Sequence, residues 1–263
     1  MRIKDKVIWI TGASSGIGEA LAYALSESGN TLILSSRNEA ELLRVKKACN
    51  PLSKVMVLPM DLGDSGMMEE LVARAIEMSG PIDMLINNAG VSQRSLIADT
   101  TLEVYRELME VNYLGTLALT KALLPHFIAQ GGGHFITVTS LMGRFGSPLR
   151  SGYCAAKHAL HGFFDVLRME HEKDGIKVTL ICPGFVRTRV AYNALTGDGS
   201  SQGLNDTATA EGMSPDVFAR KMIKAIEKQK FEAYIGGKEV SGVYLKRFFP
   251  RLLLRVVLRS RVV

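Results

Sequence analysis

The sequence has few cysteines and no long apolar segment. Three cysteines, Cys49, Cys154 and Cys182, occur among 263 residues, at spacings that match neither a Cys-x-x-Cys pair nor a Cys/His zinc site. We therefore expect free thiols, a reducing compartment and no metal site. No run of 18 uncharged apolar residues occurs, so no membrane-spanning helix is expected. The segment 1–6 leads directly into an apolar run and does not fit a signal peptide, so we expect a cytoplasmic protein.

Surplus basic charge is missing from most of the chain. The net charge is +6, and six cations after residue 239 account for all of it: Lys246, Arg247, Arg251, Arg255, Arg259 and Arg261. Acidic and basic residues balance over 1–239, which argues against a nucleic-acid-binding surface. The chain shows no internal repeat and no interdomain linker. We predict a dinucleotide-binding and catalytic domain over 1–239, followed by a basic amphipathic tail over 240–263.

Short apolar runs alternate with helical patterns along the whole chain. Strands are expected at 7–10, 31–35, 54–58, 82–86, 134–139, 177–181 and 233–235, and helices at 16–28, 38–49, 64–79, 101–130, 151–173 and 215–229. This alternation is typical of an α/β protein with helices on both faces of a parallel sheet. We predict a single doubly wound Rossmann-type domain with a mostly parallel seven-stranded sheet.

A glycine-rich turn, Thr11-Gly-Ala-Ser-Ser-Gly-Ile-Gly18, follows the first predicted strand. Glycine permits a tight turn and lets a pyrophosphate approach the N-terminus of the next helix. After the second strand, no acid stands at positions 35–37 to bond a ribose 2′-hydroxyl, whereas Arg37 offers a guanidinium to a 2′-phosphate. The pattern predicts a dinucleotide site that prefers NADP(H). NAD(H) is the alternative, because Glu39 stands nearby.

Tyr153 and Lys157 are spaced to share one face of the predicted helix 151–173. A cation beside a phenol favours the phenolate, so it lowers a tyrosine pKa that is ordinarily ~10. A tyrosine held in this way becomes an acid/base group that works near neutral pH. Ser140 lies thirteen residues before Tyr153 in the sequence.

Together these motifs resemble those of the short-chain dehydrogenase/reductase family over about residues 5–240. They are Thr11–Gly18, Asp61-Leu62, Asn87-Asn-Ala-Gly90, Asn112, Ser140, Tyr153 with Lys157, and Pro183-Gly184 with Thr188. The resemblance implies a catalytic tetrad of Asn112, Ser140, Tyr153 and Lys157. The residues that it and the glycine-rich turn assign to the cofactor are Thr11, Gly12, Ser14, Ser15, Gly16, Ile17, Gly18, Arg37, Asp61, Leu62, Asn88, Ala89, Gly90, Tyr153, Lys157, Pro183, Gly184, Val186 and Thr188.

The resemblance also implies a role for each of these groups. Tyr153 would exchange the proton of the substrate oxygen while hydride passes between the nicotinamide and the carbonyl carbon, and Ser140 would bond that oxygen. Lys157 would lower the tyrosine pKa and bond the nicotinamide ribose. Asn112 would hold a water that relays protons, and Thr188 would orient the nicotinamide ring.

Two segments are expected to form the substrate site. Residues 190–214 are rich in Gly, Ser, Asn, Asp and Thr, which predicts a substrate lid loop. Residues 141–150 contain Met142 and Phe145, which predict an apolar pocket; with Ser140 and Tyr153, they are the predicted substrate-binding residues. Arg144 and Arg150 are expected on the surface; the alternative is that they meet an anionic group of the substrate.

We therefore predict an NADP(H)-dependent oxidoreductase that interconverts a carbonyl and a secondary alcohol on an apolar or lipid-like small molecule. The alternatives are an NAD-linked alcohol dehydrogenase and a nucleotide-binding regulatory or scaffold protein without turnover. The complete tetrad argues against the regulatory protein.

The remaining expectations concern partners. Helices 101–130 and 151–173 are apolar over more than one face, which predicts a homodimer or homotetramer. In the tail, Arg247, Arg251, Arg255 and Arg259 recur every four residues and would form one stripe on a helix opened by Pro250. This helix would either lie on an anionic membrane surface or pack on the body or a partner subunit. Both interpretations stay open.

Overall fold

Seven parallel strands form one sheet, as the alternating pattern predicts. The computed structural model describes residues 3–259. The strands are β1 (Val7–Thr11), β2 (Thr31–Ser35), β3 (Val55–Val57), β4 (Met84–Asn87), β5 (Gly133–Val138), β6 (Ile176–Pro183) and β7 (Glu232–Ile235). They lie in the order β3-β2-β1-β4-β5-β6-β7, and every neighbouring pair is parallel. The predicted doubly wound Rossmann-type fold is therefore confirmed, with parallel pairing throughout.

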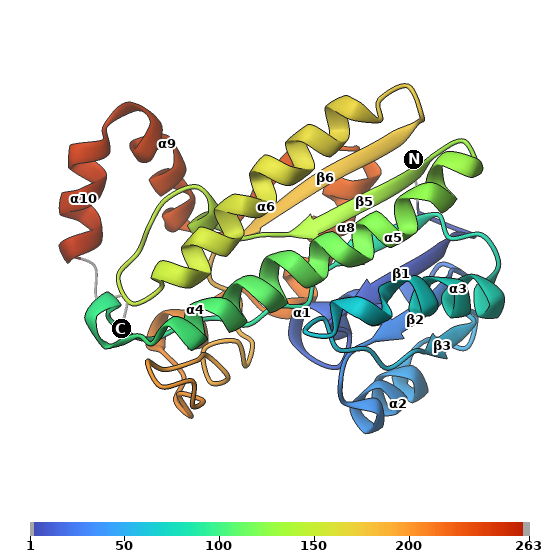
Figure 1. Ribbon diagram of the computed structural model, residues 1–263, viewed down its shortest axis with the longest axis horizontal. Helices are drawn as coiled ribbons and strands as arrows, with labels where there is room; N and C mark the ends of the chain where they lie inside the picture. The colour runs from blue at the N-terminus through green and yellow to red at the C-terminus, as the bar shows by residue number, and fades with distance from the viewer. Residues whose placement is uncertain (1–2, 260–263) are drawn as a thin grey trace.

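Helices cover both faces of this sheet (Figure 1). The helices α1 (Gly16–Ser26), α2 (Glu39–Ala48) and α8 (Pro215–Glu227) contribute to one core, and α3 (Met68–Ser79), α5 (Gly115–Ala129) and α6 (Ser151–Glu170) contribute to the other. Alternate strand residues point to opposite faces. Ile8 and Ile10 accordingly belong to the first core, and Trp9 belongs to the second.

The strand order reverses between β1 and β4. The chain moves from β1 outward to β3 and then returns to place β4 on the other side of β1. Ligands of open α/β sheets bind at such a reversal, beyond the carboxyl ends of the strands. The glycine-rich turn and Asn88 follow β1 and β4 directly, so both lie at this point.

The helix expected over 101–130 is present and contains one π-helical turn. The structure has α4 (Leu102–Met109), a π-helical turn (Glu110–Leu114) and then α5. The Nδ2 atom of Asn112 donates a hydrogen bond of 3.0 Å to the carbonyl of Leu108, in the last turn of α4. A side chain that occupies a backbone carbonyl in this way can widen one turn of a helix. The predicted range is therefore confirmed to within one residue at each end, and the widened turn places Asn112 in the buried interior.

The tail forms two helices and not one. The helix α9 (Ser241–Phe248) ends before α10 (Pro250–Arg259), and the two stand as a hairpin at one edge of the molecule (Figure 1). Pro250 lacks the backbone N–H that would continue a helix, so it opens a new one. Arg247 therefore lies on α9, apart from the arginines of α10, and the expected four-arginine stripe is wrong. No helix within 3–259 is both long enough and apolar enough to span a bilayer.

Candidate active site

A cavity of about 560 Å³ lies at the strand-order reversal. Its wall contains most of the predicted cofactor residues: Gly12, Ser14, Ser15, Gly16, Ile17, Arg37, Asp61, Leu62, Asn88, Ala89, Gly90 and Thr188. Gly12 and Gly16 have φ angles of +64° and +59°, in the left-handed region that favours glycine. A Cβ atom on Gly12 would lie 2.8 Å from the Cα atom of Ala89. The turn therefore needs glycine both for its backbone angles and for its close approach to the segment after β4.

Thr11 and Gly18 do not line this cavity, but they support the turn that does. The Oγ1 atom of Thr11 accepts hydrogen bonds from the backbone N–H groups of Asn88 (3.0 Å) and Ala89 (3.1 Å), which holds β1 to the segment after β4. A Cβ atom on Gly18 would overlap the carbonyl oxygen of Gly12. Both residues therefore fix the shape of the turn.

Arg37 is exposed at the end of β2, on the rim of the cavity. A second arginine nearby was not found by sequence reasoning. Arg44, on α2, forms an ion pair of 2.7 Å with Glu19 and donates a 3.3 Å hydrogen bond to the carbonyl of Ser14. It thereby ties α2 to the glycine-rich turn. Because Glu19 and Arg44 are far apart in sequence and on different helices, no local motif identifies this pair.

A second cavity, of about 510 Å³, adjoins the first. The two share Ile17, Asn88, Gly90, Thr188 and Val190 in their walls, so they form one continuous cleft. The second cavity is lined by all four predicted substrate residues, Ser140, Met142, Phe145 and Tyr153, and by the remaining predicted cofactor residues, Lys157, Pro183, Gly184 and Val186.

Tyr153 and Lys157 lie one turn apart on α6, at this cavity. The Nζ atom of Lys157 is 5.7 Å from the centroid of the Tyr153 ring and donates a 3.1 Å hydrogen bond to the carbonyl of Val138. Burial lowers the pKa of Lys157 to about 8. Burial also raises the pKa of Tyr153, and a hydrogen bond with Ser140 opposes that rise. This direction is the reverse of the one expected from the lysine charge alone, because a buried phenolate loses its hydration.

Asn112 lies behind the cavities. Its Nδ2 atom donates to the carbonyl of Val91 (3.0 Å) and its Oδ1 atom accepts from the N–H of the same residue (3.1 Å). A Cβ atom on Gly90 would lie 2.6 Å from Oδ1 of Asn112 and 3.3 Å from Nζ of Lys157. The structure thus brings Asn112 and Lys157 together around Gly90, while Ser140 and Tyr153 meet through their hydroxyls.

The two arginines expected on the surface lie elsewhere. The guanidinium of Arg144 makes two bonds, of 2.6 and 2.7 Å, to the carboxylate of Glu232. Arg150 is buried at 3.5 Å from Asp206, which also forms a 2.5 Å ion pair with the buried Arg94. The surface assignment is therefore wrong, because each guanidinium has found a carboxylate distant in sequence.

Asp206 also anchors the segment 190–214. It lies in this loop and its Oδ1 atom accepts a 2.7 Å hydrogen bond from the N–H of Thr209, which caps the short helix α7 (Thr207–Ala210). At the other end of the loop, the backbone of Leu195 pairs with that of Gln93. Arg94 and Arg150 line the second cavity, so their ion pairs fasten the predicted lid to the cavity wall.

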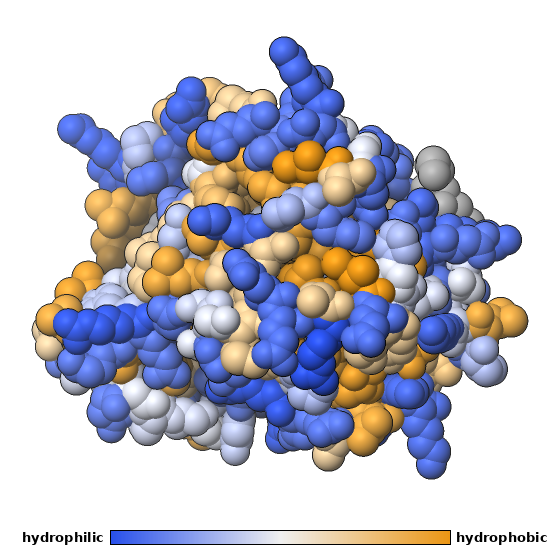
Figure 2. Space-filling model, turned by 45° about the vertical axis from the view of Figure 1, so that its right-hand side comes forward, coloured by the Kyte–Doolittle hydropathy of each residue, from blue (hydrophilic) through white to orange (hydrophobic). Residues whose placement is uncertain are grey.

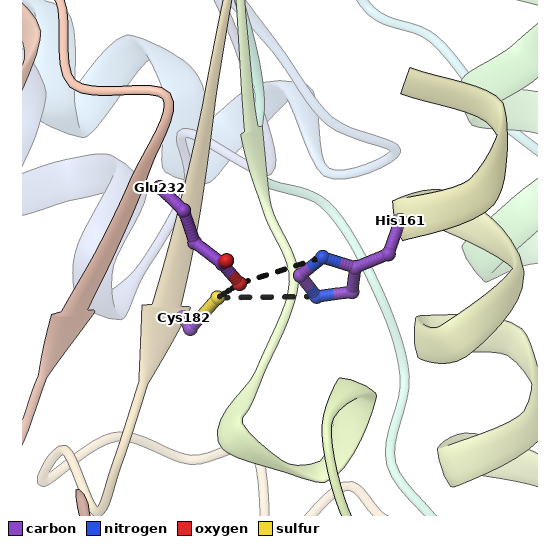
Figure 3. Close-up of side chains that lie close together, drawn as sticks. All are labelled: His161, Cys182 and Glu232. Carbon is purple, nitrogen blue, oxygen red and sulfur yellow. Dashed lines mark hydrogen bonds and ion pairs between the residues drawn. The ribbon is translucent and has the colours of Figure 1, made fainter. Parts of the chain in front are cut away.

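His161 on α6, Cys182 on β6 and Glu232 on β7 bring their side chains close together (Figure 3). The first two are buried and Glu232 is half-buried. The Cys182 thiol donates to Glu232 at 3.2 Å and lies 3.9 Å from Nε2 of His161. Burial lowers the pKa of His161 to about 4 and raises that of the thiol, so both groups are neutral near pH 7. The three side chains are near enough to hold a metal ion. However, both carboxylate oxygens of Glu232 already bond Arg144, whose positive charge disfavours a second cation.

Comparison with known proteins identifies the family. Residues 6–198 match the family model described as short chain dehydrogenase. The human protein "Dehydrogenase/reductase SDR family member 7" is 44% identical over 255 residues, which cover 94% of this chain and 75% of the human protein. The chain therefore belongs to the short-chain dehydrogenase/reductase family of oxidoreductases.

Solved structures show the same fold. A short chain dehydrogenase/reductase from Burkholderia phymatum in complex with NAD superposes with a TM-score of 0.84, at 22% identity and with 96% of each chain covered. An alcohol dehydrogenase from Thermococcus sibiricus, complexed with 5-hydroxy-NADP, gives a TM-score of 0.76 at 25% identity, covering 89% of this chain and 97% of the other. The two neighbours thus carry cofactors of different types.

Proposed function

We propose that this protein is an NADP(H)-dependent oxidoreductase that interconverts a carbonyl and a secondary alcohol on an apolar or lipid-like small molecule, with Tyr153 as the acid/base group. One observation carries the proposal. Tyr153, Ser140 and Lys157 line a mostly apolar cavity that opens directly into a second one shaped by the glycine-rich turn. The proton donor Tyr153 would therefore lie beside the oxygen of a substrate bound next to a dinucleotide.

The first cavity fits a dinucleotide. Gly12 and Gly16 line this cavity next to the N-terminus of α1, where backbone N–H groups and the helix dipole favour phosphate. Thr188, Pro183 and Gly184 would hold the nicotinamide end, near Tyr153. When bound, a nicotinamide cofactor supplies the hydride chemistry.

The residues of this chain manage the proton. The hydroxyls of Tyr153 and Ser140 are hydrogen-bonded to each other, so both face the same part of the cavity. A substrate oxygen between them receives the Tyr153 proton in reduction and returns it in oxidation. Burial keeps Tyr153 protonated, and Lys157, with its pKa lowered to about 8, gains and loses protons close to working pH. Lys157 is therefore suited to restore the proton that Tyr153 gives up.

The apolar character of the substrate is inferred from the second cavity. Leu141, Met142, Phe145, Leu245, Leu253 and Val257 contribute to its wall. A cavity of this size and lining favours ligands that bury mostly hydrocarbon around one reacting polar group. Lengthening the hydrocarbon of a ketone should therefore raise kcat/KM until the cavity is full.

The preference for NADP(H) is supported by Arg37. It is exposed on the rim of the first cavity at the end of β2, and residues 35–37 contain no acid that would bond a ribose 2′-hydroxyl. A charged hydrogen bond to a 2′-phosphate should favour NADPH over NADH by roughly 10- to 100-fold. Fluorescence titration of both cofactors against wild type and Arg37→Ser measures this. Arg37→Ser should weaken NADPH binding alone. Equal wild-type affinities for the two cofactors, or a preference for NADH, would refute the NADP(H) preference.

The activity itself is tested by following NADPH and NADH absorbance with ketones of increasing chain length, and NADP⁺ and NAD⁺ with the matching secondary alcohols. We expect turnover of the apolar members in at least one direction. Tight cofactor binding with no turnover of any compound would contradict the proposal and favour a regulatory protein that binds nucleotide.

A further inference from the structure

The tail hairpin, defined as α9 and α10, leaves large apolar side chains in solvent. Phe248 and Phe249 are 67% and 62% exposed at its tip, and Leu254 and Leu258 are 60% and 70% exposed on α10. Side chains at i and i+4 share a helix face, so Leu254 and Leu258 form a continuous apolar strip. Scattered exposed leucines are ordinary, but a grouped set of this kind marks a contact surface.

Basic side chains surround these apolar residues. Lys246, Arg247, Arg251 and Arg255 are all exposed, and no ion pair among the described residues joins any of them to a carboxylate. The sequence contains no Asp or Glu after Glu239, so no acid within the tail neutralises them. The hairpin is therefore a concentrated positive surface on a chain that is otherwise balanced in charge.

Another face of the hairpin packs on the body. Leu253 is buried against the cluster that contains Leu141 and Phe145, and Val257 packs beside it. Leu253, Val257 and Leu245 of α9 also line the second cavity. The expectation that the tail packs on the body therefore holds for the inner face, which carries Leu253 and Val257. It leaves Phe248, Phe249, Leu254 and Leu258 without cover.

The charge of the hairpin indicates which kind of partner binds its exposed apolar and basic side chains. Two hairpins from two copies of the chain would bring like charges together, which costs free energy in proportion to their number. An anionic lipid surface supplies negative charge together with an interfacial region that accepts aromatic and leucine side chains. It matches both features of the hairpin at once.

We propose that the tail hairpin docks on an anionic membrane surface, with its arginines at the lipid phosphates and its exposed Phe and Leu side chains in the interface. Because the inner face of the same hairpin lines the second cavity, docking places that cavity at the membrane, where an apolar substrate is concentrated. The docking stands by itself. The supply of substrate from the membrane rests on the proposed function.

Co-sedimentation with vesicles tests the docking. Full-length protein should bind vesicles that contain phosphatidylserine, bind phosphatidylcholine vesicles far less, and dissociate in high salt. Arg251→Gln with Arg255→Gln should lower the partition coefficient roughly 30-fold, at about fivefold for each charge. Phe248→Ser with Phe249→Ser should also weaken binding. Lys46→Gln with Lys47→Gln is the matched control, because it removes two exposed charges from α2 and should bind like wild type.

Three results would overturn the docking. The first is wild-type protein that stays in the supernatant with phosphatidylserine vesicles at low salt. The second is an arginine variant that binds as well as the α2 control. The third is light scattering in which the tail variants lose an oligomer of the wild type while vesicle binding is unchanged, which would assign the hairpin to a second copy of the chain. Circular dichroism of each variant excludes misfolding as the cause of lost binding.

A second measurement tests the supply of substrate. Wild type should consume a long-chain ketone dissolved in phosphatidylserine vesicles faster than the arginine variant does, while both consume a short water-soluble ketone equally. Equal rates on the vesicle-borne ketone would refute the supply route. Failure to consume either ketone would refute the proposed function. Vesicle binding does not require turnover, so the binding of the inactive variant Tyr153→Phe to vesicles would still decide the docking.

Discussion

The hydroxyl of Tyr153 lies in an environment that holds its proton. Burial penalises the phenolate, and the hydrogen bond with Ser140 and the charges of Arg94 and Arg150 offset part of this penalty. The ammonium of Lys157 is buried at the same cavity, and its hydrogen bond to Val138 stabilises the charged form. At the level of single residues, the site therefore pairs a proton donor with a nearby amine that exchanges protons near pH 8.

Replacing Tyr153 by Phe should abolish turnover and leave cofactor binding close to wild type. Phenylalanine keeps the ring in the cavity wall and removes only the hydroxyl. A loss of 10²–10⁴ in kcat is expected for an acid/base group. Steady-state kinetics and cofactor titration of the same preparation measure both quantities.

Lys157→Ala is the comparison variant for Tyr153→Phe. It should damage turnover and cofactor binding together, because the lysine lines the second cavity, which would hold both the substrate and the nicotinamide end of the cofactor. Wild-type turnover by Tyr153→Phe would exclude Tyr153 as the acid/base group.

At the level of elements, the lid segment 190–214 depends on one carboxylate. Asp206 receives Arg94 and Arg150 and caps α7. Asp206→Ala should lower the free energy of unfolding by about 3–5 kcal/mol, since it removes the carboxylate from a buried cation. Chemical denaturation measures this, and limited proteolysis should cut the loop faster.

Asp198→Asn is the control for Asp206→Ala. Asp198 lies in the same loop but is exposed and bonds only nearby residues, Thr196 and Ser200. It should leave global stability unchanged. Equal stability of the two variants would show that the buried pairs do not hold the lid.

Local sequence patterns predict the ranges of helices and strands better than they predict irregular turns within them. Strand β2 matches its predicted range because an apolar run between polar turns specifies it. The π-helical turn at Glu110–Leu114 was not predicted, since the Asn112 side chain that bonds the carbonyl of Leu108 is also held by Val91, which is distant in sequence. Thr11–Gly18 and Tyr153 with Lys157 are local motifs and were found. Arg44 and Arg94 were not found, because only the tertiary structure reveals their carboxylate partners.

At the level of the whole molecule, stability should fall in mild acid. Burial lowers the pKa of His134 from 6.5 to about 4, and His161 shows the same direction and cause. The unfolded chain therefore binds more protons than the folded one between these values. Stabilisation that is complete above pH 6.5 is lost as pH falls towards 4, by about 3 kcal/mol for each histidine.

The variant His134→Gln should reduce this acid loss. Glutamine stays neutral and is able to keep a hydrogen bond with Thr179, which lies 2.9 Å from the imidazole. Urea denaturation of wild type and variant at pH 7 and pH 4.5 gives the difference. His158→Gln, at an exposed position, should keep the wild-type dependence. An identical dependence in His134→Gln would contradict the argument.

We also predict a homodimer or homotetramer. Apolar side chains reach the surface in patches among hydrophilic ones (Figure 2), and α6 exposes Val166 and Met169, which are 45% and 70% exposed. Light scattering should give a mass above that of one chain at micromolar concentration. Val166→Glu with Met169→Glu should lower that mass, whereas Leu52→Glu, at a site 72% exposed in a turn between α2 and β3, should not. A wild-type monomer would refute the prediction.

Thr188 and Val190 belong to the walls of both cavities. A molecule in one cavity and a molecule in the other therefore press on the same two side chains. If the two binding free energies are coupled through these side chains, thermodynamic linkage requires the effect to be mutual. Whatever factor the cofactor applies to the dissociation constant of the substrate, the substrate must apply to that of the cofactor. Two titrations, performed in opposite order, would have to return the same coupling constant.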